Sequence, residues 1–304
     1  MEITIILIDQ IFKMLLMMVI GYSAYKLHII NDISSKELSN FLLKIISPLT
    51  IFNAFLIDYS NDKLINIFIM LLLSIFSIGI GVILCKIILK DNNKIQRFGI
   101  IFSNVAFIGI PLVSAICGEE YLIYLSIYII TFNVYLWTYG VYFMSDGKES
   151  INIKNIIHNP VIISVFIGFL FFIFRIPIAS QLKYVVSGFS KCNTFIAMFV
   201  LGSYLAKDKL LNLFIKPICY KVSFFRLLVI PIIVVLVFIL VPNEYMYLKL
   251  TALLASSTPC GVFAAIFAQK YNEDYLLASN MVSLSTLLSL ISIPIVISLS
   301  INLW

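Results

Sequence analysis

Charged residues are scarce in this sequence. Asp, Glu, Lys and Arg make up only 12% of the 304 residues, whereas hydrophobic residues make up 62%. Soluble domains carry about 25% charged residues, so this composition excludes a protein that buries its apolar side chains in one water-exposed globule. The expected surroundings are a lipid bilayer, in which each spanning helix needs roughly 20 predominantly apolar residues.

The patterns of common catalytic and metal sites are also missing. Neither HExxH nor GxSxG occurs, and the two histidines, His28 and His158, lie near expected helix ends. The five cysteines are scattered, with no CxxC spacing, and are expected to behave as small hydrophobic residues. These absences argue against an intramembrane enzyme, and the sequence predicts neither a metal ion nor a cofactor.

Basic residues outnumber acidic ones, and the formal net charge is +6. They lie between apolar runs, a distribution that indicates membrane topology rather than a nucleic-acid partner. If the N-terminus is outside, most basic residues of the connections fall inside, the exceptions being Lys63, Arg175, Lys183 and Lys249. The positive-inside rule therefore predicts a multi-pass protein of the cell membrane with both termini outside.

Ten apolar runs are separated by clusters of charge, Gly, Asn and Pro. They are too long and too uniformly apolar for barrel strands, and backbone groups in lipid must be hydrogen-bonded within their own segment. We expect an all-α polytopic membrane protein with ten transmembrane helices, at residues 3–27, 38–57, 64–89, 98–117, 121–144, 156–174, 184–206, 222–241, 247–268 and 275–303.

The longest polar stretch, residues 145–155, divides the chain into two halves of five helices, 1–144 and 156–304. Because five is odd, the second half enters the membrane in the opposite orientation. Residues 118–122 and 272–276 are both short acidic turns followed by Tyr-Leu, which supports an internal repeat. Inverted repeats of this kind recur in secondary transporters. We expect residues 145–155 to be a cytoplasmic linker.

The fourth and ninth apolar runs contain polar residues, Gly and Pro near the middle of the membrane. Pro removes a backbone donor and Gly weakens a helix, so both runs are expected to be broken there. The alternative is that each proline only kinks its helix. A broken helix leaves free N–H groups that favour a carboxylate, and paired breaks in two halves point to a transporter site. The predicted substrate-binding residues are Asn104, Gly109, Pro111, Ser257, Thr258 and Pro259.

Three further polar residues inside the spans are candidates for the same site. Asn133 and Asn280 are expected to line the substrate cavity, the alternative being hydrogen bonds between helices. Lys44 lies one turn before Pro48 and either offers positive charge to an anion or extends to the inner surface.

Other charged residues within the spans favour a structural interpretation. Asp9 and Lys13 are four residues apart, so they share a helix face and are expected to pair near the outer surface. The alternative is a proton-linked switch. Arg226 lies nearer to the end of its run and is expected to extend toward the membrane surface. Apart from Asp9, no acidic residue lies deep in a run, so the coupling ion is left open.

Several short motifs follow one another at defined spacing. Asn104 is followed by Gly109-Ile110-Pro111-Leu112, Pro259-Cys260-Gly261 comes later, and the last run contains Leu284-Ser285-Thr286-Leu287-Leu288-Ser289-Leu290. Their order resembles the auxin efflux carrier family, and the last run is similar to its bacterial branch. The resemblance covers essentially the whole chain.

This resemblance implies two inverted five-helix repeats whose fourth and ninth helices are broken and cross each other. It also implies a scaffold domain, a moving transport domain, carboxylate substrates such as malate in bacteria, and a homodimer. Asn104, Pro111 and Pro259 match the family's crossover residues. Two departures argue against auxin itself: the linker is short, and Ala264 stands where plant members tend to have a second proline.

These observations together predict a secondary transporter of small organic anions that works by elevator-type alternating access. One alternative is a sodium-coupled symporter of the bile-acid type, which a sodium-dependent flux would distinguish. Another is a channel, although no continuous polar stripe runs along several helices.

Overall fold

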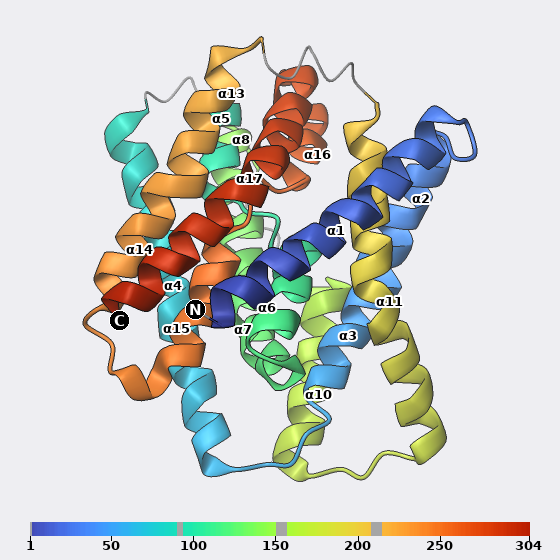
Figure 1. Ribbon diagram of the computed structural model, residues 1–304, viewed down its shortest axis with the longest axis vertical. Coiled ribbons are helices and arrows are strands. Elements are labelled where there is room, and N and C mark those ends of the chain that lie inside the picture. The colour runs from blue at the N-terminus through green and yellow to red at the C-terminus, as the bar shows by residue number, and fades with distance from the viewer. Residues whose placement is uncertain (1, 90–93, 150–156, 208–214) are drawn as a thin grey trace.

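The computed structural model describes residues 2–89, 94–149, 157–207 and 215–304, and the regular structure of this part of the chain is helical apart from one isolated β-bridge (Figure 1). Six of the described helical segments are long and apolar enough to cross a membrane, and Val105–Ile116 and Pro160–Phe174 are shorter apolar segments. The all-α class is therefore confirmed for the described residues, and the apolar helices are consistent with a polytopic membrane protein. The six long segments are Ile3–Lys26, Asn61–Ile88, Glu119–Met144, Ser180–Leu205, Pro217–Phe238 and Tyr275–Leu303.

The first half of the chain contains long helices and several helical segments made of consecutive shorter elements. Its elements in chain order are α1 (Glu2–Lys26), α2 (Asp32–Phe41), η1 (Leu42–Ile46), α3 (Ser47–Ala54), α4 (Asn61–Ile88), α5 (Lys94–Ile101), η2 (Val105–Gly109), α6 (Ile110–Ile116), η3 (Glu119–Tyr121), α7 (Leu122–Tyr135), η4 (Leu136–Gly140) and α8 (Val141–Met144).

Residues 150–156 lie outside the described part of the chain, and they include most of the expected linker, 145–155. The second half of the chain follows them. Its elements are α10 (Pro160–Phe174), α11 (Ser180–Leu205), α13 (Pro217–Phe224), η5 (Phe225–Val229), α14 (Ile230–Phe238), η6 (Asn243–Tyr245), α15 (Met246–Ser257), α16 (Phe263–Lys270) and α17 (Tyr275–Leu303).

Helix starts follow the capping residues of the sequence rather than the edges of the apolar runs. The side chains of Asn31, Ser60, Asn159 and Asp274 each accept a hydrogen bond from a backbone N–H of the following turn. The second run accordingly starts at Asp32 instead of residue 38, because Asn31 caps a polar first turn that hydropathy does not detect.

Three π-helical turns precede prolines. The turns η1, η2 and η5 each end two residues before a proline, namely Pro48, Pro111 and Pro231. A proline inside a helix removes a hydrogen bond and crowds the carbonyl group of the preceding turn. A widened π turn accommodates this conflict without ending the helix, and such turns are frequent at functional sites.

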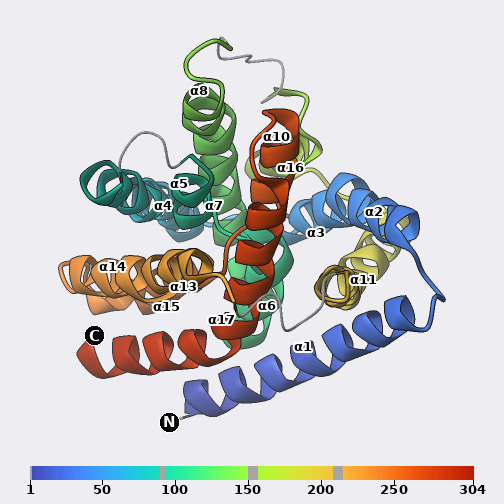
Figure 2. The same ribbon diagram turned by 90° about the horizontal axis from the view of Figure 1, so that it is seen from above.

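Two bundles of helices form the molecule. Helix α1 packs along α11, and α3 packs against both α10 and α11. Figure 2 shows α1, α2, α3 and α11 on one flank, with α4, α13, α14 and α15 on the opposite flank. The α1–α11 contact is close, because Gly21 lies on the backbone of Phe199 and Gly202 lies on that of Met18. Small residues allow this approach between membrane helices.

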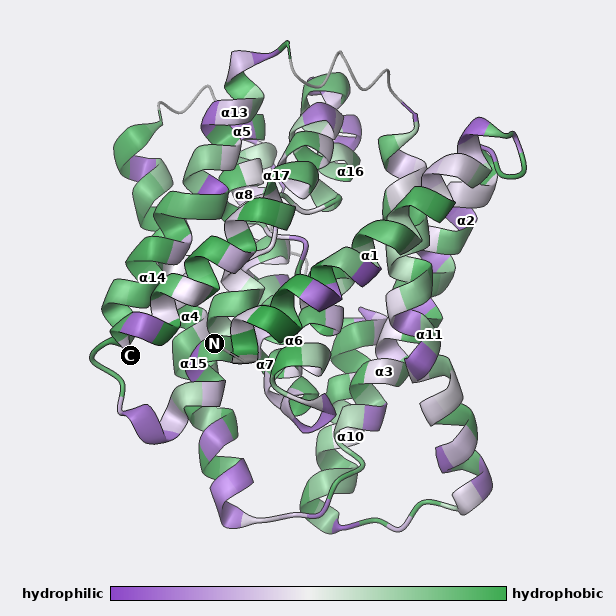
Figure 3. Cartoon of the chain, viewed as in Figure 1, coloured by the Kyte–Doolittle hydropathy of each residue, from purple (hydrophilic) through white to green (hydrophobic). Residues whose placement is uncertain are grey.

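The outer surface of the helices is apolar. Large side chains such as Phe68, Ile87, Leu240 and Ile291 are exposed on it. Figure 3 shows hydrophobic residues over most of the sides of the molecule, with hydrophilic residues gathered mainly toward its upper and lower edges. Exposed apolar surface of this extent would be unfavourable in water, so the distribution agrees with a chain that is surrounded by lipid.

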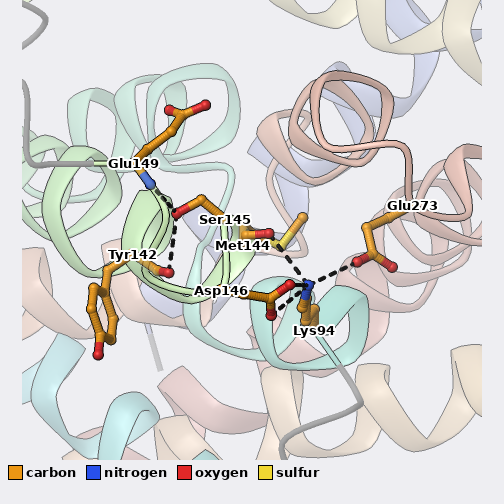
Figure 4. A network of polar contacts seen from close by, with 7 residues as sticks. All are labelled: Lys94, Tyr142, Met144, Ser145, Asp146, Glu149 and Glu273. Carbon is orange, nitrogen blue, oxygen red and sulfur yellow. Dashed lines mark hydrogen bonds and ion pairs between the residues drawn. The ribbon is translucent and has the colours of Figure 1, made fainter.

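A polar network joins the start of α5, the turn after α8 and the end of α16 (Figure 4). The ammonium group of Lys94 lies 2.7 Å from Asp146 and 3.2 Å from Glu273. Close to it, Lys270 and the hydroxyl of Tyr271 both donate to the carboxylate of Glu149, at 3.0 and 2.9 Å. The network therefore links residues 145–149 to both segments that the sequence predicts to be broken.

Acid should weaken this network. The hydrogen bond from Lys94 holds the pKa of Asp146 below its usual 3.8, and the hydrogen bonds from Lys270 and Tyr271 lower the pKa of Glu149 below 4.5. Carboxylates with depressed pKa values stabilise the fold above the unfolded values, and this contribution is lost as the pH falls through the folded values. We expect the melting temperature of the purified protein to change little above about pH 5 and to fall below it.

A double variant separates this effect from general acid sensitivity. Asp146→Asn with Glu149→Gln should melt lower than wild type at pH 7 and lose part of the decline below pH 5. The matched control is Asp58→Asn, an exposed carboxyl outside the network. Identical pH profiles for the double variant and wild type would show that the network contributes nothing to stability.

Candidate functional site

The two segments expected to be broken are interrupted, and the interruptions lie against each other. Helix α5 ends at Ile101 and η2 begins at Val105, while α15 ends at Ser257 and α16 begins at Phe263. Between them, the Asn104 N–H donates to the Pro259 carbonyl at 2.8 Å, and the Gly261 N–H donates to the Phe102 carbonyl at 2.9 Å.

These two hydrogen bonds form an isolated antiparallel β-bridge between Ser103 and Cys260. Gly261 permits the contact, because a Cβ atom at this position would lie 2.7 Å from the Ser103 carbonyl oxygen. The Cys260 N–H donates in turn to the hydroxyl of Ser285 on α17, at 3.1 Å. The backbone N–H groups of Asn104, Cys260 and Gly261 thus each have a hydrogen-bond partner in another segment.

Arg226 differs from its sequence prediction. It was expected to extend toward the membrane surface, but its side chain is only 3% exposed and lies beside the interruptions. The guanidinium donates to backbone carbonyl groups of both α5 and the end of α15. The expectation was wrong because hydropathy gives the depth of a residue along its own helix, not the unpaired carbonyl groups that neighbouring segments present.

A cavity of about 150 Å³ lies beside the interruptions. Its polar lining residues are Lys44, Ser103, Asn104, Asn133 and Asn159. The fold therefore brings together three residues predicted for the site, Lys44, Asn104 and Asn133. The remaining walls are apolar and comprise Leu43, Val105, Ala106, Phe107, Ile129, Phe132, Pro160, Val161 and Phe263.

The amide groups around the cavity differ in their hydrogen bonding. Asn133 donates to the carbonyl of Ile129 at 2.8 Å and accepts from the side chain of Asn159 at 2.9 Å. The side-chain nitrogen of Asn104 has no partner, although this residue is only 3% exposed. Buried donors are almost always hydrogen-bonded, so this unpaired donor in a residue that lines the cavity marks Asn104 as a candidate ligand contact.

Helix starts surround the same cavity. The lining includes the first residues of η2, the first residue of α16 (Phe263) and the first residues of α10 (Pro160 and Val161). The first N–H groups of a helix have no partner within it and carry partial positive charge. At α10, Pro160 has no N–H group and the Val161 N–H is capped by the Asn159 side chain, so this helix start offers its dipole rather than a free donor. The helix starts and Lys44 together make the cavity favourable for negative charge.

Residues 6–297 match the family model described as "Membrane transport protein", which is the model of the auxin efflux carrier family. The chain belongs to this family. The match extends over both halves of the chain and all the elements of the site, so the protein is a membrane transporter. A comparison with the curated proteins finds no match.

The other residues predicted for the site do not line the cavity. Pro259 takes part in the bridge, while Gly109 and Pro111 are buried in η2 and α6, after the interruption. Thr258 donates its hydroxyl to the Ala255 carbonyl at 2.8 Å. In this member of the auxin efflux carrier family, prolines and glycines therefore shape the segments around the cavity, and other side chains face it.

Two predicted residues are buried with unpaired polar atoms away from the cavity lining. They are Ser257, through its hydroxyl, and Asn280, through its side-chain oxygen. Asp9 and Lys13 form the expected ion pair, at 2.5 Å, with both side chains more than half exposed. Asn159 was not predicted for the site, although its place before a proline at a helix start marked it as a capping residue.

Proposed function

We propose that the chain is a secondary transporter of small organic anions, such as malate or another carboxylate, in the bacterial branch of its family. The observation that carries this proposal is the unpartnered amide of Asn104 beside a cavity that Lys44 also lines. The amide and the ammonium group are both hydrogen-bond donors, and a carboxylate accepts from both.

Charge around the cavity supports an anion. Its described lining contains one basic side chain and no acidic one. A sodium site of the bile-acid type would need several oxygen ligands converging on one point, whereas the unpaired polar atom at this cavity is a nitrogen donor. We therefore favour the anion carrier over the sodium-coupled alternative.

The proposed architecture has ten spans in two inverted repeats, within residues 1–144 and 156–304, with the interrupted segments crossing at the Ser103–Cys260 bridge. The scaffold domain comprises α1 to α3, α10 and α11. The transport domain comprises α4 to α8 and α13 to α17. Lys44 then belongs to the scaffold, and Asn104 belongs to the part that moves.

Much of the boundary between these parts is apolar, which supports an elevator-type movement, and the Asn133–Asn159 hydrogen bond is a polar contact across it. A small cavity of about 10 Å³ there is lined mainly by apolar residues, among them Met14 and Met18 of α1, Met198 of α11, and Ile108 and Leu112 on the opposite side. Thr286 and Ser289 also line it, and their hydroxyls donate within their own helix, α17. Methionine side chains are flexible and adapt to different neighbours. Such a boundary lets the transport domain slide along the scaffold without breaking polar contacts at these residues.

The protein is proposed to lie in the cell membrane with both termini outside and the linker in the cytoplasm. Figure 1 draws the N- and C-termini at similar heights along the vertical axis, which is compatible with an even number of spans. The basic connections of the sequence give the direction of this orientation.

The test of this function is uptake into proteoliposomes of labelled malate and a labelled indole monocarboxylate. We expect saturable uptake of at least one acid, and accelerated exchange when unlabelled acid is loaded inside, as for a carrier. Each measurement is repeated with and without a sodium gradient and a pH gradient. Unsaturable flux would indicate a channel, strict sodium dependence would favour the symporter, and no uptake of either acid would contradict the proposed substrate class.

A further inference from the structure

Arg226 binds the backbone of both interrupted segments at once. Its Nε donates to the Thr258 carbonyl at 2.9 Å, and Nη2 donates to the Ser256 carbonyl. Its Nη1 lies 3.1 and 3.3 Å from the carbonyl oxygens of Ile100 and Ile101. One side chain from η5 thus connects the last turn of α5 to the end of α15.

These carbonyl groups belong to helix ends that lack internal partners. The last four carbonyl groups of a helix have no intrahelical donor and carry partial negative charge. Two such helix ends, those of α5 and α15, meet at the interruptions and are buried there. The Ser103–Cys260 bridge joins the two segments just after these ends. Without a cation, the two negative ends would oppose each other in a medium that screens charge poorly.

We propose that Arg226 is a positioning residue that fixes the two interrupted segments in register. By holding the C-terminal ends of α5 and α15 together, it sets where η2 and α16 begin and hence how their first residues face the cavity. Arg226 itself is not among the residues that line the cavity. The effect on transport rests on the proposed function, whereas the effect on the interruptions does not.

Arginine is suited to this role and lysine is not. Guanidinium is planar and presents five N–H donors in a fixed fork, whereas an ammonium group is a compact charge on a flexible stem. Four carbonyl groups from two segments match the fork. A graded series is therefore expected, in which Arg226→Lys keeps part of the effect and Arg226→Gln loses most of it.

The native cysteines report the local structure directly. Cys260 is fully buried in the second interruption, Cys117 is buried away from it at the end of α6, and Cys192 is exposed. The probe is N-ethylmaleimide, with the modified cysteines identified by mass spectrometry of the purified full-length protein. Every cysteine should react once the protein is unfolded in denaturant, which is the positive control, and Cys117 should react only if the protein unfolds.

We expect Arg226→Gln to raise the labelling rate of Cys260 roughly tenfold or more, because local opening exposes it. Cys117 should stay protected, and Arg226→Lys should be intermediate. The matched control is Lys249→Gln, which removes another buried cation, on α15 itself, and should leave Cys260 protected. In uptake, Arg226→Gln should raise the KM roughly tenfold.

Two results would overturn this role. One is a Cys260 labelling rate in Arg226→Gln that equals the wild-type rate. The other is a rise in Cys260 labelling in Lys249→Gln as large as that in Arg226→Gln. If Arg226→Gln does not yield folded protein, Arg226→Lys decides, and wild-type labelling in that variant overturns the proposal. If wild type transports no organic acid but Cys260 opens as described, the proposed function fails and the positioning role stands.

Discussion

Lys44→Gln should raise the KM for a transported organic anion by about ten- to a hundredfold. A hydrogen bond to a charged group contributes about 1.5–3 kcal/mol, and Lys44 is the one basic side chain in the described lining of the cavity. Gln keeps much of the length and one donor function but removes the charge. The measurement is the initial rate of uptake against substrate concentration in proteoliposomes.

Two further variants sharpen this result. Lys44→Arg retains the charge and should stay closer to wild type than Lys44→Gln. Lys36→Gln removes an exposed charge of α2 outside the cavity and should leave the KM unchanged. Equal KM values for Lys44→Gln and wild type would mean that Lys44 extends to the membrane surface, which is the alternative that the sequence allowed.

Gly261→Ala should reduce transport at least about tenfold and lower stability by about 1–3 kcal/mol, the usual cost of overpacking. The added Cβ would lie 2.7 Å from the Ser103 carbonyl oxygen and 3.3 Å from that of Phe102. Because these are backbone atoms, the two interruptions must separate, and the hydrogen bonds of the bridge lengthen or break. Thermal melting and uptake of the same preparation measure both effects.

The control for this prediction is Gly79→Ala in α4, where an added Cβ would meet no atom within 4 Å. It should leave both uptake and melting close to wild type. If Gly261→Ala behaves like this control, the contact between the two interruptions is not required for the transport cycle.

Hydropathy and local spacing were sufficient for the parts of the structure that depend on neighbours in sequence. Apolar runs predicted the long helices, and a spacing of four residues predicted the Asp9–Lys13 pair. The polar and proline-containing stretches predicted where two segments are interrupted. These features follow from helix periodicity and from the missing donor of proline, which a single sequence displays.

Features that depend on contacts between distant segments were not predictable in the same way. The burial of Arg226 depends on carbonyl groups more than 25 residues away in sequence. The pairing of Asn159 with Asn133 joins the two halves of the chain. Gly109 and Pro111 lie in the predicted segment but outside the cavity, because the interruption precedes the π turn.

Equilibrium binding tests most directly whether the Asn104 amide binds the transported anion. The labelled acid that wild type transports fastest is titrated onto purified wild type, Asn104→Ala and the control Asn302→Ala, an exposed residue near the end of α17. Ala fits the backbone at residue 104, where φ is −91°. We predict that Asn104→Ala raises the Kd at least about tenfold, as expected for a lost hydrogen bond to a charged group, while Asn302→Ala leaves it unchanged. Wild-type affinity in folded Asn104→Ala would contradict the account and place the anion elsewhere.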